Sequence, residues 1–364
     1  MRRLALLAAV LPLIAAAPAA AATHGDLVSS KPLSGGNVLK NASKNLLVTY
    51  KTQGVAGSLV DVTGSVAIPK GKAPKGGWPV FTWAHGSTGI ADSCAPTATK
   101  LDAYINPFLN KVLKAGFAVV RTDYEGLGGP GDHPYLNGSS EGHSVLDIVR
   151  AARKGNAAIG KTVLIGGHSQ GGHAALWAAA LAKKFTPELK VGGTVAFAPA
   201  SHIGDQAGLL KTVDLTSLSP LVGIILRGAQ ISQPSLNIEP LLSDAARAVW
   251  PETLTKCLGD LAKPDSWGAL PLTALVQPDA VIQPVVDFLN ANDPETLTIR
   301  TPVLVLQGTA DGTVLPLFTD PLVGELGKNG SKPTYKKYTG ATHVSIATGA
   351  KPQKDALAFV RSHD

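Results

Sequence analysis

The chain of 364 residues contains only two cysteines and none of the short motifs that usually hold a metal ion. Neither C-x-x-C nor H-E-x-x-H, which are common spacings for zinc ligands, occurs in it. The sequence therefore predicts no metal site and no cofactor. An even number of cysteines in an exported protein favours a disulfide, here between Cys94 and Cys257. Two buried free thiols are the alternative.

Charged residues are also scarce. They make up 16% of the chain, and the formal net charge is +7. Removing the two N-terminal arginines leaves +5, because residues 1–22 contain no acid. The compact basic runs, 69–77 and 328–337, have the composition of lysine-decorated surface turns. A nucleic-acid-binding surface needs a denser stripe of arginine and lysine, so we expect no nucleic-acid partner.

Long apolar runs are confined to the N-terminus. Residues 1–22 contain two arginines, an apolar run from Leu4 to about Ala17, and small residues that satisfy an A-x-A cleavage rule. This pattern predicts a signal peptide cleaved after Ala22, export by the general secretion route, and an extracellular or cell-envelope location. An uncleaved anchor is the alternative, although the run is short for a bilayer. No later segment predicts an integral membrane span.

The rest of the chain alternates strand and helix signals. Residues 23–40 are expected to be loosely held, while 45–52 and 57–69 alternate apolar and polar residues and predict an antiparallel pair at a sheet edge. Continuously apolar runs predict strands of a parallel sheet buried on both faces: 79–86, 116–124, 161–169, 190–200, 301–311 and 333–343. Helical patterns lie between them: 106–116, 141–155, 170–185 and 351–364. We therefore predict one α/β domain, residues 23–364, with a helical cap inserted at about 202–298.

The pattern G-x-S-x-G occurs twice, around Ser140 and around Ser169. It can mark a catalytic serine on a sharp turn from strand to helix, where any side chain on the glycines would strike a neighbouring element. Ser169 has a predicted strand before it and a predicted helix after it. Ser140 follows a segment rich in proline and glycine, and is typical of a helix cap. We therefore predict Ser169 as the nucleophile and Ser140 as the start of a helix.

A serine nucleophile needs a histidine as base and an acid that orients the histidine. In enzymes that carry the nucleophilic serine on such a turn from strand to helix, the three residues follow along the chain in the order serine, acid, histidine. Asp311 and His343 follow two successive predicted strands, at the same sheet edge as Ser169, and complete the order. Asp320 lies too far past its strand, and the histidines beside Ser169 cannot reach back onto it in the right direction.

An oxyanion hole needs two N–H donors near the nucleophile. We predict the backbone N–H of Gln170, the residue after the nucleophile, as the first donor. The loop after the strand at 79–86 supplies the second, the backbone N–H of Ser87, with Thr88 next in line. The ring of His85 is expected to pack rather than to react.

The motifs together resemble the secretory lipase family of α/β-hydrolases, of the lipase A type. The matching pieces include WAHGSTGIADSCAP, GFAVVRTDYEGLG, GGHSQGGHAALWAA, QGTADGTV and GATH, and they span most of residues 79–345. The resemblance implies an α/β-hydrolase fold, a triad of Ser169, Asp311 and His343, a helical cap over an acyl tunnel, and a disulfide between Cys94 and Cys257. Yeast members carry a Tyr- and Asp-containing segment where this chain has HGSTG.

We therefore predict a secreted serine esterase or triacylglycerol lipase that works through an acyl-enzyme, without metal or cofactor. Its partner would be a small-molecule or lipid ester, with transient contact between the cap and a lipid interface. An acyltransferase with the same triad, a peptidase of the same fold and a non-catalytic binding protein are the alternatives. The leucine-rich cap, which has few charges to grip a peptide, argues against the peptidase.

Overall fold

A nine-stranded sheet forms the centre of the molecule, in the order β1-β2-β3-β5-β4-β6-β7-β8-β9. The computed structural model describes residues 21–212 and 214–364, so nearly all of the predicted signal peptide lies outside the described residues. The strands are β1 (Leu27–Pro32), β2 (Ala42–Gln53), β3 (Leu59–Pro69), β4 (Trp78–Ala84), β5 (Ala118–Thr122), β6 (Ile159–His168), β7 (Lys190–Phe197), β8 (Val303–Gly308) and β9 (Pro333–Tyr338).

The six strands β4 to β9 pair with one another in parallel. At one edge of the sheet, β1, β2 and β3 pair in an antiparallel way, and β3 is also antiparallel to β5. The predicted antiparallel pair and the parallel centre are therefore both confirmed. The prediction that residues 23–40 are loosely held is wrong in part, because β1 pairs with β2 from Leu27 to Pro32. The strand LVSSKP is mostly exposed, so it lacks the apolar alternation by which a strand is recognised.

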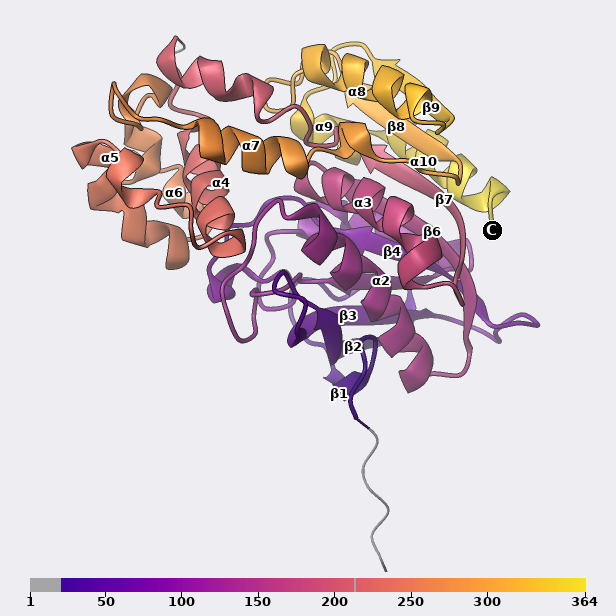
Figure 1. Ribbon diagram of the computed structural model, residues 1–364. Coiled ribbons are helices and arrows are strands. Elements are labelled where there is room, and N and C mark those ends of the chain that lie inside the picture. Colours follow the sequence, from indigo (N-terminus) through magenta and orange to yellow (C-terminus); the bar gives the residue numbers. More distant parts are fainter. Residues whose placement is uncertain (1–20, 213) are drawn as a thin grey trace, which may run out of the picture.

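Helices cover both faces of the sheet (Figure 1). One face packs against α2 (Gly138–Gly155), α3 (Gln170–Phe185) and α8 (Pro316–Lys328). The other face packs against α1 (Asn106–Lys114), α9 (His343–Thr348) and α10 (Ala350–Ser362). Burial of the strands from both sides explains why their sequences are continuously apolar.

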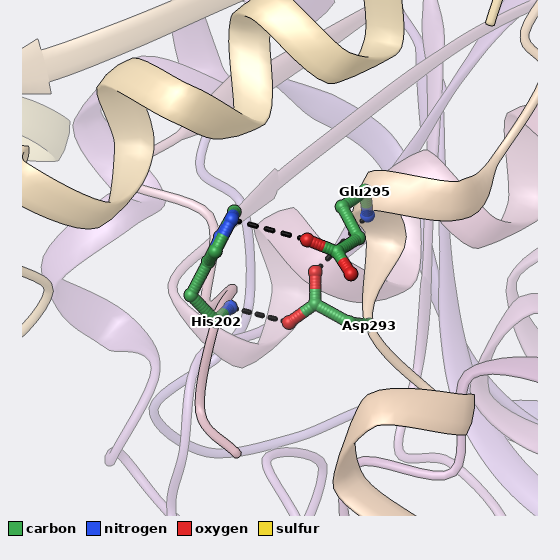
Figure 2. A group of neighbouring side chains, drawn as sticks. All are labelled: His202, Asp293 and Glu295. Atoms are coloured by element: carbon green, nitrogen blue, oxygen red, sulfur yellow. Dashed lines mark hydrogen bonds and ion pairs between the residues drawn. The ribbon is translucent and has the colours of Figure 1, made fainter. Parts of the chain in front are cut away.

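The segment between β7 and β8, which we call the insertion (residues 198–302), is helical. It contains α4 (Ser219–Ser232), α5 (Asp244–Val249), α6 (Leu258–Leu261), α7 (Gln283–Ala291) and several 3₁₀ turns, and these helices gather at one side of the sheet in Figure 1. The insertion has its own apolar cluster, which also takes in Ile90, Tyr135 and Leu136. Its two ends meet, because His202 contacts Asp293 and Glu295 (Figure 2).

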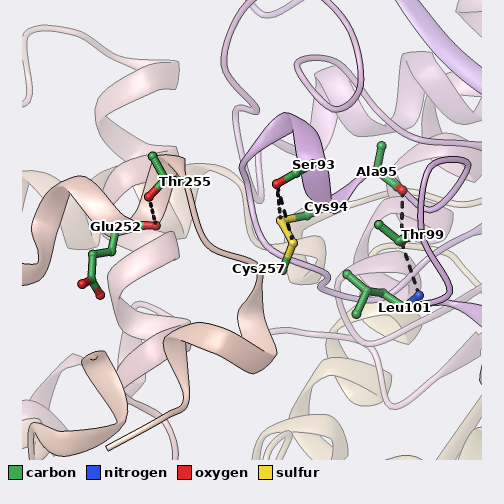
Figure 3. The surroundings of a disulfide bond; sticks show 8 residues. All are labelled: Ser93, Cys94, Ala95, Thr99, Leu101, Glu252, Thr255 and Cys257. Carbon is green, nitrogen blue, oxygen red and sulfur yellow. Dashed lines mark hydrogen bonds between the residues drawn. A yellow bond between two sulfur atoms is a disulfide. The ribbon is translucent and has the colours of Figure 1, made fainter. Parts of the chain in front are cut away.

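A disulfide between Cys94 and Cys257 links the insertion to the loop that follows β4 (Figure 3). The backbone of the same loop adds a hydrogen bond, from Leu258 N–H to the carbonyl of Thr88, at 2.9 Å. The approach is close at Gly89, where a Cβ would lie 3.0 Å from the Cα of Cys257 and 2.9 Å from the sulfur of Cys94.

Within the described part of the chain, no helix is long and apolar enough to cross a membrane.

Candidate active site

Ser169 occupies a sharp turn between β6 and α3. Its φ and ψ are 60° and −121°, a conformation that residues with a side chain adopt only at a cost of about 1–3 kcal/mol. Backbone hydrogen bonds hold the turn: Ser169 N–H donates to Phe197, and the Ser169 carbonyl accepts from His173 and Ala200. The residue is therefore fixed at the carboxyl end of β6, facing the insertion.

The glycines around Ser169 allow the turn to pack. A Cβ on Gly167 would lie 1.9 Å from the carbonyl oxygen of Gly171. A Cβ on Gly171 would lie 2.0 Å from the carbonyl oxygen of Ala84 at the end of β4. Neither distance is possible for real atoms, so alanine at either position would push α3 away from the sheet.

The other G-x-S-x-G segment, around Ser140, has a different local structure. It forms the first turn of α2, and its glycines make room for α3, since a Cβ on Gly138 would overlap the ring of Trp177. The prediction that Ser140 begins a helix is confirmed, but its assignment as the cap is wrong. Asn137 is the cap, and its side chain accepts from Ser140 N–H. The Ser140 hydroxyl instead donates to Glu125.

Asp311 and His343 meet after β8 and β9. His343 Nδ1 lies 2.8 Å from Asp311 Oδ2, and the other carboxylate oxygen accepts from the backbone N–H groups of Thr313 and Val314, both at 2.9 Å. Burial alone would raise the pKa of Asp311, but the hydrogen bond and charge of His343 and these two N–H donors outweigh burial and lower it. Asp311 therefore stays ionised beside the imidazole.

His168, the residue before Ser169, positions His343 through its backbone. Its Nε2 donates to the carbonyl of His343 at 2.8 Å, and its Nδ1 accepts from the hydroxyl of Tyr104 at 2.9 Å. Burial, followed by the neighbouring charge of His343, lowers the pKa of His168 to about 3. The ring is therefore neutral and keeps one tautomer. Sequence reasoning did not assign this positioning contact, because it depends on tertiary packing.

Of the two predicted oxyanion donors, one lies at the start of α3 and the other on the loop that follows β4. Gln170 begins α3, so its backbone N–H is one of the unpaired donors of a helix N-terminus. Ser87 lines the same cavity as Ser169 and His343, and its hydroxyl contacts the hydroxyl of Tyr135 at 2.5 Å. The neighbouring hydroxyl of Thr88 is buried and, among the described residues, has no hydrogen-bond partner.

Glu141, from the G-x-S-x-G segment around Ser140, binds the side chain of Gln170, the residue after the candidate nucleophile. Its Oε1 accepts from the amide of Gln170 at 2.8 Å and from Leu136 N–H at 3.0 Å, and its Oε2 lies 3.1 Å from His173 Nδ1. Gln170 also contacts His133. The segment therefore supports the turn at Ser169 as part of a buried polar network, a role that no sequence pattern indicated.

Two cavities meet at the candidate nucleophile, and Ser169, Leu221 and Thr313 line both of them. The first, which we call the apolar cavity, extends into the insertion between aliphatic side chains of α4 and α7, such as Ile225 and Leu289. The second, the histidine cavity, contains His343, Ser87 and Thr88. An acyl group and a reacting carbonyl could thus occupy neighbouring spaces.

The sheet, the insertion and the turn at Ser169 define an α/β-hydrolase. Residues 94–353 match the secretory lipase family, so the chain belongs to that family. The structure of the rice cell wall degrading esterase LipA from Xanthomonas oryzae is similar, with a TM-score of 0.74, 20% identity, and coverage of 93% of this chain and 98% of that one. The predicted fold class and family are confirmed.

Two sequence relatives differ in what their names state. Lipase A of Moesziomyces aphidis is 28% identical over 254 residues, which are 65% of this chain and 51% of that protein. A Mycobacterium tuberculosis protein named probable inactive lipase is 24% identical over 323 residues, 82% of this chain and 69% of that protein. The chain spans about half the length of lipase A.

The buried pair of Glu141 and His173 should make the stability of the fold depend on pH. Burial lowers the pKa of His173, but the hydrogen bond and charge of Glu141 outweigh burial and raise it above 6.5. A histidine whose pKa is higher in the folded state stabilises the fold at any pH below its pKa in the unfolded state. This stabilisation is lost as the pH rises through the pKa of the folded state. We expect Glu141→Gln to lower the free energy of unfolding by about 2–4 kcal/mol, and the loss to be larger near pH 6 than near pH 9.

Thermal or urea unfolding of both proteins at the two pH values measures this difference. Glu188→Gln, which removes a partly exposed carboxylate paired with Arg150, is the matched control and should show a small, pH-independent change. A Glu141→Gln effect that is the same at both pH values would contradict the assigned pairing with His173.

Proposed function

We propose that the protein is a secreted serine hydrolase that cleaves carboxylic esters through an acyl-enzyme on Ser169. The observation that carries the proposal is the Asp311–His343 hydrogen bond beside a cavity that also contains Ser169. Membership of the secretory lipase family supports the same reaction class.

Each residue of the proposed triad has a distinct role. His343 faces Asp311 through Nδ1, which leaves Nε2 to take the proton of the Ser169 hydroxyl as its oxygen attacks the ester carbonyl. Asp311 stabilises the imidazolium that forms. His343 then gives the proton to the leaving alcohol, and water repeats the sequence to release the acid and restore Ser169.

The oxyanion of each tetrahedral intermediate would be held by the backbone N–H groups of Gln170 and Ser87. The first lies at the N-terminus of α3, where the helix dipole also favours negative charge. The buried hydroxyl of Thr88, which has no partner among the described residues, is a further group that can donate in the same cavity.

The apolar cavity favours a fatty acyl group as the acid part of the ester. It is lined mainly by aliphatic side chains of the insertion and reaches Ser169. The insertion would thus act as the cap, and its exposed apolar side chains, such as Leu215 and Val281, would make transient contact with a lipid interface. Arginine and lysine residues do not line this cavity within the described part of the chain, which disfavours a peptide with acidic groups.

Secretion is part of the proposal. Residues 1–22 have the pattern of a cleaved signal peptide, the family is described as secretory, and a disulfide joins Cys94 to Cys257. Disulfides persist in oxidising compartments outside the cytosol. An acyltransferase would use the same triad, and would be recognised by an alcohol acceptor that outcompetes water for the acyl-enzyme.

Replacing each of the two motif serines by alanine, in separate variants, tests which one is the nucleophile. Ser169→Ala should reduce kcat for p-nitrophenyl butanoate by about 10⁴-fold or more, because the attacking oxygen is lost. Ser140→Ala is the matched control, since it changes the serine of the other G-x-S-x-G segment; it should retain activity within about threefold once folded protein is counted. Substantial hydrolysis by Ser169→Ala, measured against an uncatalysed blank, would refute the assignment.

Narrowing the apolar cavity tests the acyl site. Ile225 lines this cavity on α4, and Ile225→Trp should lower kcat/KM for a dodecanoate ester by about tenfold or more while changing that for a butanoate ester by less than about threefold. Ile231→Trp, on the same helix but away from the cavity lining, is the control. Equal losses for both ester lengths would argue against an acyl chain in this cavity.

A further inference from the structure

A histidine and three carboxylates gather at the base of the insertion, outside the candidate active site. His202 follows β7, Asp293 and Glu295 lie at the 3₁₀ turn before β8, and Glu325 lies on α8. His202, Asp293 and Glu295 join the two ends of the insertion (Figure 2), and the contact of His202 with Glu325 joins them to α8. The proposed hydrolysis uses none of these four residues.

The distances have the pattern of a coordination site. His202 Nε2 lies 3.1 Å from Oε2 of Glu295 and 3.1 Å from Oε2 of Glu325. Ligand atoms that each bind a zinc ion at about 2.0–2.1 Å in a tetrahedron lie about 3.3 Å from one another. Ligand atoms of His202, Asp293 and Glu295 all lie within 4.8 Å of one another. One cation can thus reach the histidine and its carboxylate neighbours after small side-chain movements.

The His202 ring is an unusual partner for these carboxylates. Its side chain is only 6% exposed, and its Nε2 lies between Glu295 and Glu325 at ion-pair distance from both, in a geometry that gives a hydrogen bond to neither among the described residues. The Oε2 atom of Glu325 is buried and likewise has no hydrogen-bond partner among them. A metal ion could bind both groups at once in place of this ion pair, because a neutral imidazole and a carboxylate are both good ligands.

The cluster also carries excess negative charge. Three carboxylates face one imidazole, and in the described part of the chain no lysine or arginine forms an ion pair with any of them. The ligand atoms of Asp293 and Glu295 lie within 4.8 Å of each other, so their negative charges repel. Such mutual repulsion is relieved by a divalent cation.

We propose that His202, Glu295 and Glu325, with Asp293 as a third carboxylate, form a structural zinc site that clamps the two ends of the insertion to α8. The imidazole selects zinc over calcium and magnesium, which prefer oxygen ligands alone. The ion takes no part in ester hydrolysis, so the site departs from the sequence-based expectation of no metal site while leaving the proposed reaction unchanged.

Zinc titration of untagged, chelator-treated protein tests the site. Isothermal calorimetry should show one Zn²⁺ per chain with a Kd of about 10 μM or tighter, and excess Zn²⁺ should raise the Tm by several degrees, since a ligand that binds only the folded state stabilises it. Ca²⁺ at the same concentrations should do neither. Saturable binding of Ca²⁺ but not Zn²⁺ would overturn the proposal.

Two variants assign the ligands. Glu325→Gln, at a residue that is about one-third exposed on α8, should weaken Zn²⁺ binding about tenfold or more without unfolding the protein. His202→Asn should do the same, because asparagine tolerates the positive φ of 53° found here. Glu188→Gln, which removes an acid elsewhere on the surface, is the matched control and should bind Zn²⁺ like the original chain.

Zinc binding by His343 and Asp311 in the candidate active site has to be distinguished from binding at His202. His343→Ala should therefore retain the calorimetric binding and the rise in Tm. Loss of binding in His343→Ala, or unchanged affinity in both Glu325→Gln and His202→Asn, would show that the ion binds elsewhere and would overturn the proposal.

Discussion

The close approach of α3 to the end of β4 is the constraint on which the rest of the site depends. Gly171 can lie against Ala84 only without a side chain, and Ser169 then has to adopt a positive φ. This contact brings the helix N-terminus next to the loop after β4. The two proposed oxyanion donors, Gln170 and Ser87, lie on these two segments.

The same loop connects the site to the insertion. Within about ten residues it carries Ser87 and Thr88 beside the nucleophile, then Gly89 against the insertion, and finally Cys94 in the disulfide. The insertion is thus held on one side by a covalent link. On the other side, at its base, the cluster around His202 joins its two ends. The apolar cavity is lined mainly by the insertion, so its shape depends on how the insertion is held.

Sequence reasoning predicted the parts of the molecule that local patterns control. The strands near Ser169, Asp311 and His343 are buried on both faces and read as continuous apolar runs. It missed β1, whose side chains are mostly exposed. It also missed contacts between segments far apart in the chain: Glu141 with Gln170, His168 with the His343 carbonyl, and His202 with the acids before β8 and on α8. Such pairings follow from how helices pack, which no single segment specifies.

The most direct test of the account is the site of covalent labelling by a fluorophosphonate, which reacts with an activated serine and not with an ordinary one. The native protein should take up one reagent molecule, and mass spectrometry of its peptides should place the adduct on Ser169. Protein unfolded before treatment should remain unlabelled. An adduct on Ser140, or none on Ser169 in native protein, would contradict the account.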